Sequence, residues 1–323
     1  MNGERTLDEE SIIRILWSKL GKSATNRDPF EDDAAWVINH SKEKFLVAKA
    51  DMFVASTDAP PQMQPWQMAR KSIVACISDL AAKGVHPDYC LISIGLPKHF
   101  ANEDFVSSMA EGFSKAESEY GVKIIGGDTN ATSSDFVIDC SISGFATSLV
   151  HRKGARTGDL VGVSGKFGAQ PAGLLILLGK AKSSDKSFET LAVKSVLEPE
   201  ARLDAGLSAS KFLSSCIDSS DGLAISLYHL IESNEKSFDL DVLPIQTGAE
   251  QFALENGLES SELVLFGGEE YELVGTYSRE NEEEVAKLGF QTIGKVIENR
   301  EGEPMLLVNG EPVARRGWIH FKS

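Results

Sequence analysis

Long apolar runs are missing from this sequence, and cysteine is scarce in it. No run approaches the ~20 consecutive apolar residues that a membrane-spanning helix needs, so we expect no membrane span. The first residues, MNGERTLDEESIIRIL, lack the basic start and continuous apolar core of a signal peptide, so we expect a cytoplasmic protein. The four cysteines lie in apolar segments with no C-x-x-C pair, which argues against a zinc knuckle and a disulfide framework.

Basic residues are also in deficit. Lysine and arginine total 32 against 48 aspartates and glutamates, which gives a net charge of −16. A protein that binds the phosphate backbone carries the opposite excess, so we expect no nucleic-acid partner. The six histidines share no recognisable motif with a serine or cysteine, so nucleophilic catalysis of the triad type finds no support.

Familiar phosphate-binding loops are absent as well. Residues 160–179, LVGVSGKFGAQPAGLLILLG, predict a strand, a glycine-containing loop and a helix, which is a general layout for anion binding at a helix N-terminus. The segment has neither the G-x-x-x-x-G-K-[ST] spacing nor the G-x-G-x-x-G spacing. A structural turn is therefore the default interpretation.

Residues 70–84, RKSIVACISDLAAKG, predict a central helix with one buried stripe. Its apolar residues recur at helical spacing, Pro65 lies just inside the expected start and Gly84 just past the expected end. Asp79 does not fit a plain core helix, because a carboxylate in the last turn faces the negative end of the macrodipole at a cost of roughly 0.3–1 kcal/mol. We therefore expect a positive charge beside Asp79.

Aspartates follow or interrupt apolar segments at five separate places. They are Asp32 with Asp33, Asp51, Asp79, Asp128, and Asp218 with Asp221. Two carboxylates ~4 Å apart repel by about 1 kcal/mol in water and about 4 kcal/mol near a protein surface, so a converging set needs cations. Oxygen ligands without histidine or cysteine suit magnesium, which commonly bridges substrate phosphates. Solvated carboxylates stay the alternative, since spacing does not prove convergence, and a glycosidase pair needs fewer aspartates.

The chain divides at the basic, glycine-flanked segment 152–158. We place the domain boundary just before it, with domains of residues 1–148 and 149–323. In the first half we expect a mostly buried strand pair over 45–56, a strand over 89–95, a helix over 103–120, a short strand and Gly-Gly turn before Asp128, and a last strand over 136–147. In the second half we expect a helix from about Leu223, capped by Ser220 or Asp221, and IGKV as a closing strand.

Eight short motifs occur in order over nearly the whole chain. They are DDAA (Asp32–Ala35), Asp51, SDLAAKG (Ser78–Gly84), GGDT (Gly126–Thr129), RKGARTGD (Arg152–Asp159), IDSSDGL (Ile217–Leu223), GGEEYEL (Gly267–Leu273) and IGKV (Ile293–Val296). The set resembles the thiamine-monophosphate kinase family, which belongs to a superfamily with aminoimidazole ribonucleotide synthetase and selenophosphate synthetase.

The resemblance implies a two-domain α+β fold like that of aminoimidazole ribonucleotide synthetase. The N-terminal sheet would form a β-barrel across the interface of a homodimer, and the C-terminal α+β domain would close the nucleotide cleft. It also implies ATP and thiamine monophosphate as substrates, several Mg²⁺ ions on the phosphates, and direct in-line phosphorylation to thiamine diphosphate.

By motif, the resemblance also assigns site residues. The implied metal ligands are Asp32, Asp51, Asp79, Asp128, Asp218 and Asp221. The implied ATP contacts are Gly127, Asp128, Arg152 and Ser220. The residues implied to hold thiamine phosphate are Asp58, Glu269 and Trp318. The residues implied to carry catalysis are Asp79, Asp128, Arg152 and Asp221.

The chain departs from the family pattern at a few positions. Lys49 and Ala50 stand where hydroxyl residues are usual, and Asp58 stands where an aromatic residue or histidine is expected. Ala50 can make no side-chain metal contact. Two other functions stay open: an ATP-dependent activation of an amide or formyl oxygen, as elsewhere in the superfamily, and nucleotide binding by a homologue that has lost turnover.

Overall fold

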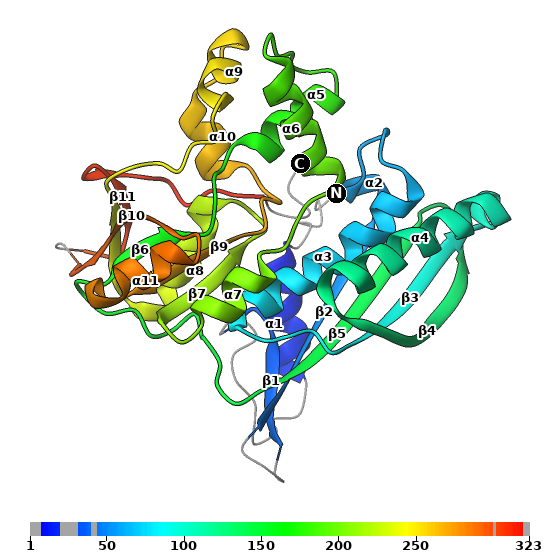
Figure 1. The fold of residues 1–323 in the computed structure, drawn as a ribbon, viewed down its shortest axis with the longest axis horizontal. Coiled ribbons are helices and arrows are strands. Elements are labelled where there is room, and N and C mark those ends of the chain that lie inside the picture. Colours follow the sequence, from blue (N-terminus) through cyan, green and yellow to red (C-terminus); the bar gives the residue numbers. More distant parts are fainter. Residues whose placement is uncertain (1–7, 20–31, 40–43, 300–301, 319–323) are drawn as a thin grey trace, which may run out of the picture.

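The computed structural model describes residues 8–19, 32–39, 44–299 and 302–318. These residues form two sheets with helices between them and around them (Figure 1). The predicted mixed α+β class is therefore confirmed. Among the described helices, none combines the length and the apolar character needed to cross a membrane.

The first sheet has five strands and one open face. Its order is β1 (Ala35–Asn39), β2 (Lys44–Val54), β5 (Val137–Ala146), β3 (Tyr89–Pro97) and β4 (Lys123–Thr132). Neighbouring strands are antiparallel except β3 and β4, which are parallel. Because side chains alternate along a strand, Val47 and Phe53 of β2 are buried under helix α3 (Pro65–Lys83), whereas Met52 is exposed on the other face. Helix α4 (Glu103–Tyr120) packs against α3, and the short elements α1 (Glu9–Lys19), α2 (Ala55–Asp58) and η1 (Lys98–Phe100) complete this half.

The second sheet has seven strands, all from residues 160–312. Its order is β12 (Glu311–Pro312), β11 (Leu306–Val308), β8 (Ser237–Leu240), β10 (Gln291–Ile297), β6 (Leu160–Val163), β9 (Glu272–Tyr277) and β7 (Leu213–Ser219). Helix α8 (Leu223–Asn234) covers one face, where Val274 of β9 joins its apolar residues. The next residue towards the N-terminus, Leu273, belongs instead to the core that includes α3 and α7 (Leu203–Ala209). One hydrophobic core thus runs from the first sheet, through α3, to the second sheet.

Four helices form a smaller apolar cluster of their own at the top of Figure 1. They are α5 (Ala169–Leu177), α6 (Lys186–Leu197), α9 (Ala249–Glu255) and α10 (Ser260–Phe266). Helices η2 (Arg279–Asn281) and α11 (Glu282–Lys287) lie before β10 in the chain. In the four-helix cluster, Phe188 and Phe252 pack against each other with their ring planes tilted by 46° and their ring centroids 5.6 Å apart.

Helix α3 is the central element, as its sequence predicts. Pro65 follows the N-cap residue Gln64, and Gly84 ends the helix in the left-handed conformation with φ of 68°. The helix packs on β2 and β5 on one side and on α7 and β7 on the other. Every residue from Ala69 to Lys83 except Ala75 is buried, so the helix is enclosed on all sides rather than along one stripe.

Two expectations for the first half are wrong. Residues 45–56 are not a strand pair, because β2 runs unbroken to Val54 with no turn residue to interrupt it. The Gly-Gly segment before Asp128 is not a turn, because β4 continues through it alongside β3. A Cβ on Gly127 would lie 1.7 Å from the carbonyl oxygen of Ile92, so glycine is needed there for the close approach of the neighbouring strand.

Two expectations for the second half are also wrong. Helix α8 has Gly222 as its N-cap, without a side-chain hydrogen bond at the cap, so neither Ser220 nor Asp221 caps it. The IGKV segment lies inside β10 and is not the closing strand, since β11 and β12 follow it. By contrast, the helix over 103–120 is confirmed as α4, and it ends at Gly121 in the left-handed conformation.

Candidate functional site

Polar side chains on the enclosed helix α3 need partners, because burying an unpaired polar group is costly. Ser78, Asp79 and Lys83 are buried near its C-terminal end, and Lys71 is buried two turns earlier. Each of them meets a partner from another element. The helix therefore brings polar groups from both sheets to one region, and the site can be described from these partners.

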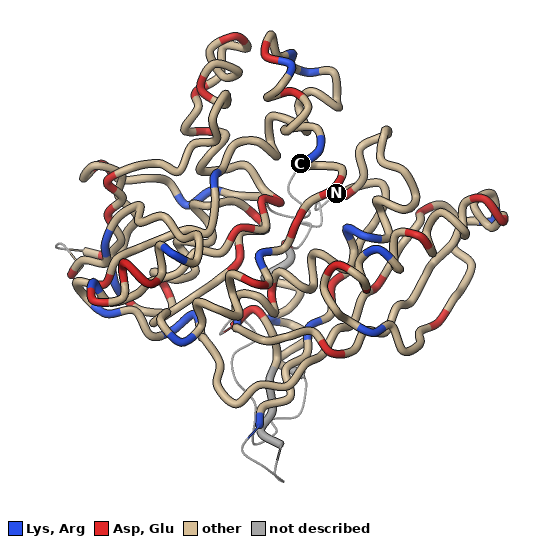
Figure 2. Tube along the Cα trace, in the orientation of Figure 1, with Lys and Arg blue, Asp and Glu red and all other residues tan. Residues whose placement is uncertain are grey.

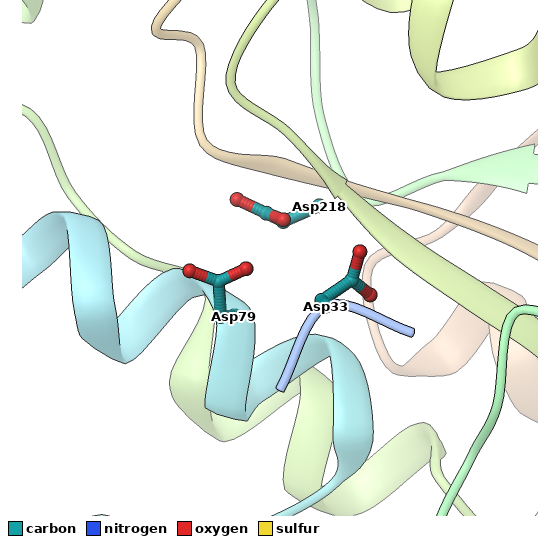
Figure 3. A group of neighbouring side chains, drawn as sticks. All are labelled: Asp33, Asp79 and Asp218. Atoms are coloured by element: carbon teal, nitrogen blue, oxygen red, sulfur yellow. The ribbon is translucent and has the colours of Figure 1, made fainter. Parts of the chain in front are cut away.

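Three aspartates from distant parts of the chain converge beside α3 (Figure 3). Asp33 comes from the segment just before β1, Asp79 from α3, and Asp218 from β7. All three are buried, and one carboxylate oxygen of each lies within 4.8 Å of the others. We call Asp33, Asp79 and Asp218 the three-aspartate cluster. Ser78 donates a hydrogen bond of 2.8 Å from Oγ to Asp218 Oδ2 and so orients that carboxylate.

Asp33 belongs to a closed set of charges that we call the Lys83 group: Asp32, Asp33, Lys83 and Arg152. Lys83 Nζ lies 2.6 Å from Asp33 Oδ2, and Arg152 Nε donates to Asp33 Oδ1 at 2.6 Å. Lys83 also contacts Asp32 and donates to the carbonyl oxygen of Cys216 at 3.1 Å. Burial acts to raise the pKa of Asp33, but the Arg152 and Lys83 charges outweigh it and hold that pKa at about 2.

Asp79 and Asp218 lie in a more open set that we call the Lys49 group: Lys49, Asp51, Asp79 and Asp218. Lys49 Nζ lies 3.0 Å from Asp79 Oδ2 and 3.8 Å from Asp51 Oδ2, so the positive charge expected beside Asp79 is confirmed. Burial nevertheless raises the pKa of Asp79 well above its usual value, with Asp218 and Asp33 adding to the effect. Burial and the nearby Asp33 charge likewise raise the pKa of Asp218 to about 6. Among the ion pairs of the described residues, Lys49 is the one cation in contact with the carboxylates of this group.

The Asp32 carboxylate makes different contacts from those of its neighbour Asp33. Its Oδ2 lies 2.7 Å from Nδ1 of His151, and its Oδ1 contacts Lys83. The structure thus places Asp32 between Lys83 and the segment that crosses to the second half, and it places Asp33 in the cluster. The metal role that the resemblance gives to Asp32 stays a prediction.

Lys71 links two of the three residues implied to hold thiamine phosphate, Asp58 and Glu269. Its ammonium lies 2.7 Å from Glu269 Oε1 and donates to the carbonyl oxygen of Asp58 at 2.8 Å. The Asp58 carboxylate accepts a hydrogen bond of 2.6 Å from the backbone N–H of Val54, which fixes the start of α2. Tyr271 is buried next to this pair, and burial together with the charges of Glu269 and Asp51 raises its pKa well above its usual value. Asp58 and Glu269, which we call the substrate side, therefore lie close to the Lys49 group.

The loop that follows Asp218 contacts the other implied substrate residue. The backbone N–H of Trp318 donates to the carbonyl oxygen of Asp221 at 3.0 Å, and the N–H of Glu269 donates to the carbonyl oxygen of Ser220 at 2.5 Å. A Cβ on Gly317 would lie 2.7 Å from that same Asp221 oxygen, so only glycine lets the tail approach so closely. The Trp318 side chain is 59% exposed, which leaves its ring at the surface beside this loop.

Gly127 and Asp128 lie away from the three-aspartate cluster. The register pairs Asp128 with Ser93 and Gly127 with Ile92 on β3. Ile92 is buried and Ser93 is exposed, so the alternation of side chains puts Asp128 on the open face with Ser93. Within one chain, the structure does not bring Asp128 to Asp79, and its predicted metal and ATP roles stay predictions.

Sequence reasoning passed over several residues of this region. In the sequence Asp33 stands out only as half of an acidic pair, and no motif marks Lys71, Lys83 or Tyr271 as site residues. The available signal was charge within an apolar helix, since Lys71 and Lys83 stand in the same buried stretch as Asp79. Figure 2 shows how acidic and basic residues from both halves meet near the centre of the molecule.

The donor set fits a magnesium ion. It consists of carboxylate oxygens from the three-aspartate cluster and Asp51, without histidine or cysteine, and Mg²⁺ prefers such ligands. Among the ion pairs of the described residues, Lys49 is the one cation in contact with Asp51 and Asp79, so these carboxylates are short of positive charge. A divalent cation would supply it.

Comparison with known proteins places the chain among nucleotide-using enzymes. The family described as "AIR synthase related protein, N-terminal domain" matches residues 31–150. The thiamine-monophosphate kinase of Nitrosopumilus maritimus is 37% identical over 98% of this chain and 99% of its own length. The thiamine-monophosphate kinase of Escherichia coli K12 is 30% identical over 98% of each chain. The solved structure of AaThiL complexed with AMPPCP and TMP has a TM-score of 0.87 at 29% identity, covering 99% of this chain and 100% of that one.

Proposed function

The chain belongs to the thiamine-monophosphate kinase family, and on that premise we propose that it transfers the γ-phosphoryl group of ATP directly to thiamine monophosphate. The products would be thiamine diphosphate and ADP. The observation that carries this proposal is that Asp33, Asp79 and Asp218 converge on the same helix that carries Lys71, the partner of Glu269. Phosphoryl transfer needs a cation site and a substrate site close together. AaThiL, which has a similar fold, is complexed with an ATP analogue and TMP.

We further propose that Asp33, Asp51, Asp79 and Asp218 hold Mg²⁺. When bound, Mg²⁺ would neutralise phosphate charge and so reduce the repulsion between the two substrates. The roles implied for Asp32, Asp128 and Asp221 remain part of the proposal, with Asp221 acting from the loop that contacts Trp318.

The residues of the chain would contribute positioning and fixed charge. The acceptor is a phosphate oxygen that is already ionised, so no general base is required. Arg152 and Lys83 hold Asp33 in one orientation, and Ser78 holds Asp218. Lys71 would keep Glu269 in place for thiamine monophosphate. Charges fixed in this way before the reaction need no reorganisation during it.

We propose that the open face of the first sheet is the homodimer interface and that a β-barrel closes there. The face carries exposed apolar side chains on four strands: Met52, Tyr89, Leu91, Ile125 and Phe145. An exposed apolar patch of this kind is typical of an interaction surface. Sedimentation velocity would report a dimer, and a monomer after Leu91→Glu; a wild-type monomer would contradict the proposal. We also propose a domain boundary just before Arg152.

The kinase proposal is tested by incubating the purified chain with ATP, Mg²⁺ and thiamine monophosphate and measuring thiamine diphosphate by chromatography. We expect product from the wild type and a loss of at least ~100-fold in kcat/KM for Asp79→Asn at low Mg²⁺. Asp104→Asn, an exposed change in the first turn of α4, is the matched control and should behave as wild type.

Two outcomes would count against the proposal. If the wild type made no thiamine diphosphate, the chain would be either a superfamily enzyme with another acceptor or a nucleotide-binding homologue without turnover. If Asp79→Asn kept near-wild-type turnover at low Mg²⁺, its assignment as a metal ligand would be wrong.

A further inference from the structure

Lys49 is an unusual residue to find in an acidic site proposed to bind a metal. Its side chain lies on the same face of β2 as Asp51 and the buried residues Val47 and Phe53, the face covered by α3. A lysine on this face cannot extend to bulk solvent as it would on the open face. Its ammonium instead lies 3.0 Å from Asp79 Oδ2 and 3.8 Å from Asp51 Oδ2, and its side chain is 25% exposed.

The position of Lys49 matters because it changes the net charge of the site. Asp33 is already paired with Lys83 and Arg152. The other three carboxylates of the region, Asp51, Asp79 and Asp218, have one cation in direct contact among the ion pairs of the described residues, and that cation is Lys49. Three negative charges and one positive charge leave an excess of two, which a single divalent ion would balance. Without Lys49 the excess would be three.

We propose that Lys49 is a fixed cation of the site. Its ammonium occupies the position between Asp51 and Asp79 that a divalent ion would otherwise bridge, so the chain binds one divalent ion fewer than it would with a neutral residue at position 49. This inference rests on the proposed magnesium-dependent function. The geometry supports it because a Mg²⁺ ion lies only about 2.1 Å from its oxygen ligands, and an ion bridging these two carboxylates would have to displace the ammonium.

The test counts bound metal and needs no turnover. Mn²⁺ is titrated into the wild type, Lys49→Ser and Lys49→Gln in the presence of a saturating non-hydrolysable ATP analogue, and the free ion is measured by electron paramagnetic resonance. We expect each variant to bind one more Mn²⁺ per chain than the wild type. Lys49→Arg keeps the charge and should bind the wild-type number, and so should Lys44→Ser, which removes an exposed lysine from the same strand.

Equal Mn²⁺ numbers in the wild type and both neutral variants would overturn the inference. Production of thiamine diphosphate by the wild type is measured separately, so a failed kinase assay with an unchanged Mn²⁺ difference would refute the proposed function and leave Lys49 as assigned.

A second measurement uses the wild type alone, in case the variants fail to fold. The rate of acetylation of Lys49 is followed by peptide mass spectrometry with and without Mg²⁺ and the ATP analogue. If the ammonium keeps its position, Mg²⁺ should leave the rate the same or lower it. A several-fold faster acetylation in Mg²⁺ would show that the metal displaces Lys49, and the inference would be wrong.

Discussion

The Lys83 group and the Lys49 group lie side by side at the C-terminal end of α3, yet they balance their charges differently. In the Lys83 group two carboxylates face two cations, and the Lys83 and Asp33 side chains are each 1% exposed. In the Lys49 group three carboxylates face one lysine, and the Asp51 side chain is 38% exposed. The charges of the first group balance one another. The second group keeps a net negative charge, which favours the binding of a cation.

The pKa shifts follow the same division. The pKa of Asp33 is lowered because two cations outweigh its burial, whereas those of Asp79 and Asp218 are raised because burial and like charges outweigh one shared lysine. The Lys83 group joins the segment before β1, helix α3, the crossing segment at Arg152 and strand β7. We infer that Lys83 and Arg152 act as a structural clamp that holds Asp33 in place, and that the Lys49 group is the part of the site left with an unbalanced negative charge.

The largest expected effect comes from breaking the clamp. Lys83→Met keeps most of the side-chain volume but removes the ammonium from Asp32 and Asp33, so a buried charge pair loses one partner. Such a loss typically costs about 3–5 kcal/mol of the free energy of unfolding. Urea unfolding monitored by circular dichroism measures it.

Lys49→Met is the matched control for this comparison. Its ammonium is partly exposed and its carboxylates can accept a cation from solution, so with Mg²⁺ present we expect a loss below about 1 kcal/mol. Equal losses for the two variants would remove the distinction between a clamp and a ligand-binding group.

Sequence patterns predict the helix that carries this site, but they do not predict which residues contact one another in it. Local rules predicted α3, because proline and glycine mark its ends and the apolar spacing marks its body. They also predicted a cation near Asp79 from the helix dipole, but not that the cation is Lys49, since β2 is remote in sequence. The adjacent Asp32 and Asp33 could not be told apart, because only tertiary packing decides which carboxylate faces Lys83 and His151 and which faces the cluster.

The failed expectations have the same cause. The Gly-Gly segment before Asp128 has the composition of a turn, yet it forms an edge strand because β3 needs a neighbour without side chains at Gly127. Ser220 and Asp221 are good capping residues, but their loop is held instead by backbone contacts to Glu269 and Trp318. In each case a partner far along the chain overrides the local preference.

A smaller effect is expected at Lys71, the other buried lysine of α3, and it tests whether a buried ion pair near the site serves substrate binding as well as stability. Lys71 is paired with Glu269 and with the Asp58 carbonyl, both on the proposed substrate side. We expect Lys71→Met to raise KM for thiamine monophosphate about tenfold, or about 1.4 kcal/mol, with kcat within twofold, because it loosens substrate binding and leaves the metal ligands in place. Steady-state kinetics with varied thiamine monophosphate measures it.

Arg70→Met is the control, since Arg70 is the adjacent buried cation of α3. It pairs with Glu119 at 2.7 Å and with the Pro199 carbonyl, away from the site. Its loss should lower stability and leave KM unchanged. If both variants raised KM equally, Lys71 would have no specific role towards substrate.

The smallest expected effect extends the comparison to a carboxyl group with no cation in contact among the described ion pairs. Glu270 accepts a hydrogen bond of 2.6 Å from the backbone N–H of Gly168, and burial raises its pKa to about 8. Because the folded-state pKa lies above the unfolded value, the stability from neutral Glu270 is complete below about pH 4.5 and is lost as the pH rises through 8. Asp33 behaves oppositely, since its lowered pKa gives stability that is lost as the pH falls below 3.8 towards about 2.

Glu270→Gln should therefore gain stability over the wild type as the pH rises from 6 to 9, while keeping an oxygen that can accept from Gly168. Because Glu270 is only partly buried, solvent screening reduces the gain to about 1 kcal/mol. Urea midpoints at four pH values measure it, and the exposed Glu311→Gln should track the wild type throughout. A constant difference between Glu270→Gln and the wild type across this range would mean that Glu270 stays ionised, and that a partly buried carboxylate in this fold can do without either a cation or a proton.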